Sequence, residues 1–429
     1  MRLLAFVTGL ALLAPTLNVA DAAVIVVDAA GGGDHTSINA AIVAAANGDI
    51  VHVKSGDYRL IDLFGVLVDG KSIVLVGAQT PAPLITGIEV KNVPAGSTQI
   101  VRNFSMVPSP FVATLGGLKC SQNSGAVLVE NCSVVGPDGS VGFAGIVVDA
   151  SPAVLVSNSA FVAITRCSIS AGKGVDAVGG INQHGSSGGG DGLFVSQSNL
   201  TAFDSVVNGG AGGDGPPASS ASNRGGHGCL LVSGSARWHG VSVRGGMGGN
   251  ALSSDLASCG AGGDGLVVPA GASAESFASS FIGCDGGWTT VGTQAAFGTD
   301  ENLWGPASHV VIAYTTKRTF RISTPTTELL PVFVFADGVP NDLVYVLLAF
   351  KAGHFVAGGT IGWLATAPPY FGPFVFGSVP ASGTLAFSAA APMLSSPSVE
   401  GEAFVFEPIF VNSTEAVVGP PSCFVLLKP

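Results

Sequence analysis

The sequence predicts an all-β protein in which a solenoid of short strands is followed by a smaller antiparallel β-domain. The chain of 429 residues is 47% hydrophobic but only 10% charged, whereas about a quarter of the residues in an average soluble domain are charged. It contains 62 glycines and 25 prolines, which punctuate many short runs of valine, alanine and serine. A unit of similar sequence also recurs at a fixed spacing, as it does in solenoids.

The first 22 residues have the pattern of a cleavable export signal. Arg2 precedes an apolar run from Leu3 to Leu13, and the ending Ala20-Asp21-Ala22 suits signal peptidase. This run is shorter than the roughly 20 residues that a membrane-spanning helix needs, and the later apolar stretch 329–350 is interrupted by Asp, Gly, Pro and Asn. We therefore expect no membrane span after removal of the signal. The expected location is outside the cell or on its surface, with the periplasm as an alternative.

Residues 24–60 predict a strand, a helix, a turn, a second strand and a turn. Ser37 is a suitable N-cap, and Asn47-Gly48 is a suitable helix end. Such a helix has a physical role, because the first coil of a solenoid has an open apolar end that must be covered. The apolar residues recur at helical spacing on one face: Ile38, Ala41, Ile42 and Ala45.

The segment TSINAAIVAAANGDIVHVKSGDYR, residues 36–59, resembles the opening of secreted pectin-lyase-like proteins of environmental bacteria. In that family a capping helix precedes a Gly-Asp-x-Val-x-Val strand and a Gly-x-Tyr turn. The resemblance spans about thirty residues and implies a right-handed parallel β-helix with a short N-terminal capping helix. It implies little about activity, because many non-catalytic proteins share this opening.

The repeat is explicit between residues 189 and 283. Equivalent apolar strands begin at Leu193, Cys229 and Leu266, in steps of 36 and 37 residues. We expect the apolar positions to stack inside the coil and the glycines to serve sharp turns or close approaches between coils. A second strand of each unit contributes an aromatic residue: Phe203, Trp238 and Phe277. Further strands are predicted at 72–77, 125–136 and 144–149.

The sequence pattern changes around residue 300, where longer strands with alternating apolar residues replace the glycine-rich repeat. From about residue 320 the pattern predicts six or seven antiparallel strands, a small β-sandwich. The segments SGTLAFSAAAP and SCFVLLKP are similar to a C-terminal module that follows β-helices in secreted bacterial proteins. The predicted domains are a signal peptide (1–22), a right-handed parallel β-helix (23–300) and a β-sandwich-like domain (301–429).

Cysteine and charge patterns exclude several classes of partner. The seven cysteines are expected to be small buried hydrophobes, with a Cys259–Cys284 disulfide between adjacent coils as the alternative. No Cys or His spacing fits a zinc site, so we predict neither a metal nor a cofactor. The formal net charge of −11 argues against a nucleic-acid partner.

His227 lies in a Gly-His-Gly, the tripeptide that carries an active-site histidine in polygalacturonase-type β-helix enzymes. Its equivalents in the neighbouring repeats are Asp191 and Asp264, which indicates a polar turn position. The polygalacturonase-type enzymes also use an Asn-Thr-Asp, an Asp-Asp and an Arg-x-Lys, and none of these occurs in this chain. Because glycoside hydrolysis needs a pair of carboxyl groups, we predict no catalytic residue.

The column of Asp191, His227 and Asp264 is still the best candidate for ligand binding, because side chains one coil apart could hold a cation or a sugar. Asp214 is a further candidate, since GGAGGDGPP loosely fits a calcium-binding repeat, although that repeat works only in tandem. The pectate-lyase motifs Arg-x-Pro-x-x-Arg and Trp-x-Asp-His are absent. Some aromatic residues could present flat faces to sugars: Trp288, Trp304, Trp363, Tyr314 and Tyr370.

We therefore expect a non-catalytic extracellular or surface scaffold that contacts polysaccharide or cell-surface glycans. The alternative is a carbohydrate-active enzyme, a polysaccharide lyase or a glycoside hydrolase. In that case three or more of Asp191, Asp214, His227, Asp264 and a nearby arginine would converge in one cleft. The sequence sets neither the ligand nor the oligomeric state.

Overall fold

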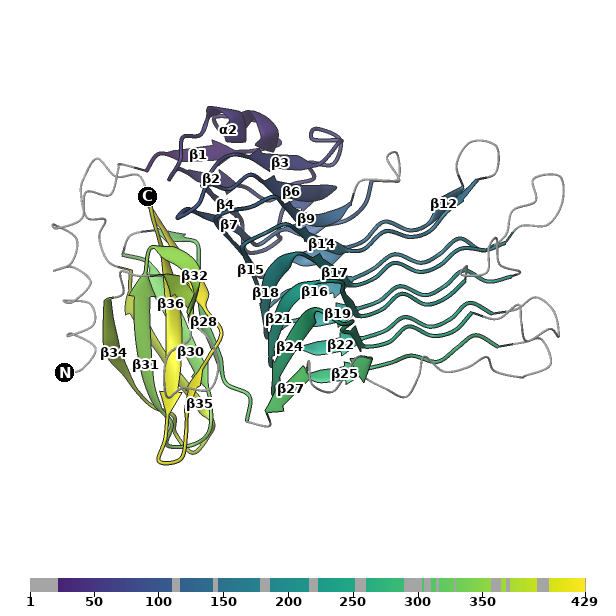
Figure 1. The fold of residues 1–429 in the computed structure, drawn as a ribbon. Coiled ribbons are helices and arrows are strands. Elements are labelled where there is room, and N and C mark those ends of the chain that lie inside the picture. The colour runs from purple at the N-terminus through teal and green to yellow at the C-terminus, as the bar shows by residue number, and fades with distance from the viewer. Residues whose placement is uncertain are drawn as a thin grey trace.

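The computed structural model consists almost entirely of strands, arranged as a parallel β-helix followed by antiparallel sheets (Figure 1). The predicted fold class is confirmed. Residues 1–21 of the predicted signal lie outside the described part of the chain. The structure describes residues 22–109, 116–141, 146–177, 186–215, 223–250, 260–288, 303–304, 310–313, 316–327, 329–355, 364–367, 371–391 and 401–428.

Three parallel sheets, which we call A, B and C, form the wall of the β-helix. The chain passes from sheet C to sheet A to sheet B in each coil. Sheet A contains β1 (Val24–Val27), β2 (Ile50–Val53), β4 (Val74–Gly77), β7 (Thr98–Arg102), β10 (Ala126–Glu130), β15 (Phe161–Thr165), β18 (Ser198–Phe203), β21 (Gly234–His239), β24 (Ala272–Phe277) and β27 (Val310–Ala313). Sheet B contains β5 (Leu84–Ile85), β8 (Ser105–Met106), β11 (Ser133–Val135), β16 (Ser168–Ser170), β19 (Val206–Asn208), β22 (Ser242–Arg244) and β25 (Ser280–Ile282). Sheet C contains β3 (Val66–Asp69), β6 (Gly87–Lys91), β9 (Gly117–Ser121), β14 (Val154–Ser157), β17 (Leu193–Ser196), β20 (Cys229–Leu231), β23 (Leu266–Val267) and β26 (Leu303–Trp304).

The predicted repeat register is confirmed, because Leu193 pairs with Cys229 and Cys229 pairs with Leu266. The β-helix also continues past residue 300, since β26 and β27 still pair with its sheets C and A. Within the predicted strand 144–149, β13 (Val147–Val148) instead pairs antiparallel with β12 (Ser140–Val141) in a separate two-stranded sheet.

The register corrects the predicted aromatic column. Phe203 and Phe277 pair with His239, whereas Trp238 pairs with Ala202. Because adjacent residues of a strand face opposite sides of the sheet, Trp238 points into the coil, where it is fully buried in the main apolar core. Phe203 and His239 face outward from sheet A, where they are covered as well.

The N-terminal helix covers the first coil, as predicted (Figure 1). Helix α2 (Ile38–Ala44) has Ser37 as its N-cap, and the Ser37 hydroxyl accepts a hydrogen bond from the Ala40 N–H. The helix ends earlier than the predicted Asn47-Gly48, because Ala45 has extended backbone geometry. The four residues of its predicted apolar face are buried: Ile38, Ala41, Ile42 and Ala45.

A flat projection, which we call the fin, leaves the β-helix on the side away from the C-terminal domain (Figure 1). It consists of two layers of extended chain between sheets B and C. The outgoing layer contains residues 136–141, 171–177, 209–215, 245–250 and 283–288, and the return layer contains residues 186–192, 223–228 and 260–265.

Backbone hydrogen bonds join the fin in two directions. Within the outgoing layer, every third N–H bonds to the next coil, as when Gly209, Gly212 and Gly215 donate to the carbonyls of Arg244, Met247 and Asn250. Between the layers, the Gly226 N–H donates to Gly210, and the Gly210 N–H donates to Gly190, both at 2.8 Å. A period of three residues is that of the polyproline II helix, which has no internal hydrogen bonds.

Close approach of the two layers requires glycine in the fin. A Cβ added to Gly209 in the outgoing layer would lie nearer than 3.0 Å to the carbonyl oxygen of Gly226 in the return layer, and one added to Gly189 would lie as near to that of Gly210. Real Cβ atoms essentially never approach so closely. The glycine-rich composition of this region therefore follows from packing.

The C-terminal domain is a sandwich of two sheets around an aromatic core, which includes Phe320, Phe404 and Phe424. The first sheet contains β28 (Thr319–Ile322), β30 (Pro331–Asp337) and β35 (Thr384–Ala390). The second contains β29 (Thr326–Thr327), β31 (Leu343–Ala349), β34 (Phe371–Ser378), β36 (Gly401–Val411), β37 (Ala416–Val418) and β38 (Ser422–Leu427). A separate pair is formed by β32 (Lys351–Phe355) and β33 (Leu364–Ala367).

The sandwich packs against the outer face of sheet A. One apolar cluster combines residues of both domains, among them Leu128 and Phe161 from sheet A and Val405 and Val425 from the sandwich. Because both sides of sheet A are covered, its strands are almost continuously apolar. The sequence did not indicate this contact.

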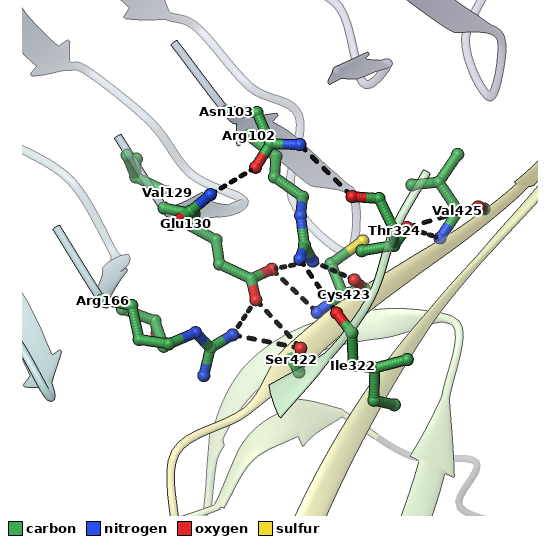
Figure 2. Close-up of polar contacts among 12 residues, drawn as sticks. Arg102, Asn103, Val129, Glu130, Arg166, Ile322, Thr324, Ser422, Cys423 and Val425 are labelled. Atoms are coloured by element: carbon green, nitrogen blue, oxygen red, sulfur yellow. Dashed lines mark hydrogen bonds and ion pairs between the residues drawn. The ribbon is translucent and has the colours of Figure 1, made fainter. Parts of the chain in front are cut away.

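A buried ionic network joins the two domains (Figure 2). Glu130 lies between the guanidinium groups of Arg102 and Arg166 and is fully buried. Its carboxylate also accepts hydrogen bonds from the Ser422 hydroxyl at 3.0 Å and the Cys423 N–H at 2.8 Å. The Arg102 guanidinium in turn donates to the Cys423 carbonyl. The carboxylate of Glu130 is therefore fully paired, whereas Arg102 Nε is buried without a hydrogen-bond partner among the described residues.

Candidate functional site

The predicted column of Asp191, His227 and Asp264 lies in the return layer of the fin, on consecutive coils. The His227 N–H donates to Asp191 Oδ1 at 2.8 Å, and the Asp264 N–H donates to His227 Nδ1 at 3.2 Å. The side chains of Asp191 and His227 thus each accept a hydrogen bond from the backbone of the next coil. The structure brings all three residues together, as the repeat predicted.

Arg224 adds a positive charge to this column. Its Nη2 lies 3.1 Å from Asp264 Oδ2, and His227 Nδ1 lies 3.2 Å from the same oxygen. Since Nδ1 accepts the Asp264 N–H, it carries no proton in this arrangement. Burial raises the pKa of Asp191 above its ordinary value, and the hydrogen bond from the His227 N–H and the charge of Arg224 act against that increase.

Asp214 does not belong to this column, because it lies in the outgoing layer. There it follows Asp176, whose Oδ1 accepts the Asp214 N–H at 2.8 Å. Asp214 Oδ1 accepts the Asn250 N–H at 2.7 Å, and Asn250 Oδ1 accepts the Trp288 N–H at 2.9 Å. The structure therefore separates Asp214 from the other three predicted residues and places it in a second row of the same kind.

The two rows have a common physical origin. In a chain of period three, one N–H per repeat points away from both layers and finds no backbone acceptor. A short side chain from the preceding coil supplies that acceptor, as Asp and Asn do in turns. The same contact occurs nearer the first coils, where Asp149 Oδ1 accepts the Gly188 N–H at 2.7 Å. The repeated preference for Asp, Asn or His at these positions follows from this requirement.

These contacts limit the chemistry that the predicted residues can perform. One acceptor atom of each of Asp191, His227 and Asp214 is already bonded to backbone, and Asp264 is paired with Arg224. Within the described ranges, no three His, Cys, Asp or Glu side chains are grouped so that they could hold a metal ion.

Sequence reasoning missed an exposed patch on the last two described coils of the outgoing layer. Two runs of three-residue spacing, RGGMGGN at 244–250 and IGCDGGW at 282–288, place an exposed side chain outward at each step. Of these, Met247 and Trp288 expose 48% and 46% of their surface. The spacing itself was the signal that could have revealed the patch. Its members are Arg244, Met247, Asn250, Ile282, Asp285 and Trp288, all of them exposed.

The other aromatic and cysteine predictions have mixed outcomes. Trp288 is exposed. Trp363, Tyr314 and Tyr370 lie outside the described residues, and so does Cys259 of the predicted alternative disulfide. The remaining cysteines are buried and unpaired with one another, which agrees with a role as small core residues: Cys120, Cys132, Cys167, Cys229, Cys284 and Cys423.

In the part of the chain that the structure describes, no helix is long and apolar enough to cross a membrane. No known protein family matches the sequence, and no curated protein matches it either.

Proposed function

We propose that the protein is an exported, non-catalytic scaffold, secreted or held at the cell surface, that contacts polysaccharide or cell-surface glycans. The pattern of residues 1–22 supports export. The segment 36–59 supports kinship with secreted pectin-lyase-like β-helix proteins. A long β-helix with a flat fin is a rigid support for surface contacts, because its backbone is fixed by hydrogen bonds in two directions.

The observation that carries the proposal is the use of the polar fin residues as backbone acceptors. A general acid or base must be able to reach the proton that it transfers. His227 Nδ1 and Asp191 Oδ1 are instead bonded to the backbone of the next coil. Both residues are therefore explained as parts of the scaffold.

A carbohydrate-active enzyme, either a polysaccharide lyase or a glycoside hydrolase, is the second candidate. One observation favours it: Asp191, His227 and Asp264 lie together in one column beside Arg224. The raised pKa of Asp191 is also typical of functional carboxyl groups.

Two assays on the same polysaccharides distinguish the non-catalytic scaffold from the carbohydrate-active enzyme. The mature protein is applied to a glycan array, and release of reducing sugar or of unsaturated products is measured in parallel. We expect binding without release. Release that is abolished by His227→Ala and retained by Asp214→Ala, with both variants folded, would establish the enzyme instead. Asp214→Ala is the matched control, because it removes the same kind of backbone acceptor in the other layer.

A further inference from the structure

The exposed patch of the outgoing layer has a regular geometry set by the scaffold. Arg244 pairs with Ile282 across the two coils. Met247 likewise lies beside Asp285, since the Gly248 N–H donates to the Asp285 carbonyl at 3.0 Å. Coils are about 4.8 Å apart, and residues three apart along an extended threefold chain are separated by about 9 Å. The six side chains therefore form a grid of two by three.

The patch differs from the coils that precede it. At the equivalent positions of the coil before, the outgoing layer carries Asn208, Ala211 and Asp214, which are smaller and half-buried. One coil earlier still, Lys173 is paired with Asp176 at 2.8 Å. Met247, Ile282 and Trp288 thus place three exposed apolar side chains close together on the last two described coils, whereas nearer the first coils the outgoing layer exposes Val141. A concentration of this kind marks a contact surface.

The backbone at Trp288 is held in place before any ligand arrives. Its backbone N–H is bonded to Asn250, and the backbone of its coil is bonded to the neighbouring layer. A ligand that stacks on its indole ring would order little of the protein, which favours binding. The neighbouring groups differ in character: Met247 and Ile282 are apolar, whereas Asp285 and Arg244 can accept and donate hydrogen bonds.

From this arrangement we infer that the patch around Trp288 binds an uncharged glycan. The C–H face of a sugar ring would stack on the indole, and its hydroxyl groups would bond to Asp285 and Arg244. This inference rests on the proposed function and names its surface and its ligand class.

The charges of the protein favour an uncharged glycan over a uronate polymer as the ligand. Arg244 and Asp285 carry one charge of each sign, so the patch has no net charge of its own, whereas the chain carries −11. A uronate polymer would be repelled by that net charge and by Asp214 on the preceding coil. A second copy of the chain would be repelled in the same way, which disfavours self-association through this surface.

Binding at a flat surface is weak for one site, so it is best measured on an array, where many copies act together. The mature protein and the variants Trp288→Ala, Trp288→Phe and Asp285→Ala are compared on neutral and uronate glycans. Lys173→Ala is the matched control, because Lys173 is an exposed residue of the same layer, several coils away. We expect Trp288→Ala to bind at least tenfold more weakly, Trp288→Phe to retain most binding, and Lys173→Ala to stay within twofold of the parent.

The outcomes distinguish this inference from the proposed function. Binding of neutral glycans that survives Trp288→Ala would overturn the assigned surface and leave the function in place. A preference for uronates would overturn the ligand class. Absence of binding to any glycan would remove the glycan contact from the function itself. Self-association in sedimentation that Trp288→Ala abolishes would assign the patch to a second copy and overturn the inference.

Discussion

The backbone N–H of Cys423 donates to the carboxylate of Glu130 at 2.8 Å, although the two residues lie 293 positions apart in the sequence. This bond joins the last strand of the sandwich to the outer face of sheet A. Glu130 is fully buried there between two arginines. Removal of one partner from a buried ion pair leaves an uncompensated charge, and this is costly.

The first prediction concerns this network. We expect Glu130→Gln to lower the free energy of unfolding by about 3–5 kcal/mol, because Arg102 and Arg166 would remain buried without their counter-ion. Urea denaturation followed by circular dichroism measures the change. Glu89→Gln is the control, since its partner Lys119 lies on the adjacent coil at the surface, at 2.9 Å, and surface pairs contribute about 0–1 kcal/mol. Equal effects of the two substitutions would refute the role assigned to Glu130.

The fin provides the second prediction. In Gly210→Ala the new methyl group would meet the backbone of Gly172 on the preceding coil of the same layer, so the backbone at Gly210 must shift. Overpacking of this kind costs about 1–3 kcal/mol. We expect faster amide exchange at Gly226, whose N–H donates to Gly210. Ala211→Ser changes the adjacent, half-buried position and should leave that exchange unchanged. Unaltered protection of Gly226 in the Gly210 variant would show that the layers are not packed as described.

His227 gives the third prediction. If its role is to accept the Asp264 N–H, His227→Asp should be tolerated, because aspartate occupies the equivalent positions in the neighbouring coils. His227→Ala should cost about 1 kcal/mol, the value of one backbone acceptor in a partly buried site. Thermal denaturation of both variants measures the difference. A stable alanine variant combined with an unstable aspartate variant would contradict the acceptor role.

The sequence predicted those features that repeat or that depend on neighbouring residues. The fixed period placed Leu193, Cys229 and Leu266 in register, and helical spacing identified the face of α2. Sequence periodicity also grouped Asp191, His227 and Asp264. It could not show that their side chains accept hydrogen bonds from backbone N–H groups. Those N–H groups lack a backbone acceptor only because of the way in which the two layers of the fin are stacked.

Features that depend on distant contacts were not predictable in this way. Arg102, Glu130 and Arg166 have no common sequence pattern, and their partner Cys423 comes from the last strand. The mistaken equivalence of Trp238 and Phe203 has a similar cause. A shift of one residue reverses the side of the sheet that a side chain faces, and an aromatic residue suits either side when both are buried.

The last prediction concerns acid sensitivity at the interface between the domains. His239 faces outward from sheet A and is 2% exposed. Its ring lies 6.1 Å from that of Phe203, and among the described residues neither of its nitrogens has a hydrogen-bond partner. Burial, with the charges of Lys317 and Arg318, lowers the pKa of His239 to about 4.

Well above pH 6.5 His239 is neutral in both the folded and the unfolded chain. Its contribution to the free energy of unfolding therefore does not vary with pH in that range. Between pH 6.5 and 4 His239 is protonated in the unfolded chain but remains neutral in the folded chain. The free energy of unfolding therefore decreases as the pH falls. The loss approaches about 3 kcal/mol near pH 4. The nearby Asp204, paired with Lys317 at 3.1 Å, has a pKa raised mainly by burial. It acts in the opposite direction, because the folded chain holds its proton more tightly.

Urea denaturation of the parent protein and of His239→Phe is measured between pH 4 and 7.5. The comparison isolates the contribution of His239 to the pH dependence of stability. The phenyl ring fills the same site next to Phe203 without a titrating group, so the stability of the variant should depend less steeply on pH over this range. Phe203→Leu is the control, because it alters the same contact and keeps His239, and its pH profile should run parallel to that of the parent. Parallel profiles for the parent and His239→Phe would show that His239 does not carry the acid sensitivity.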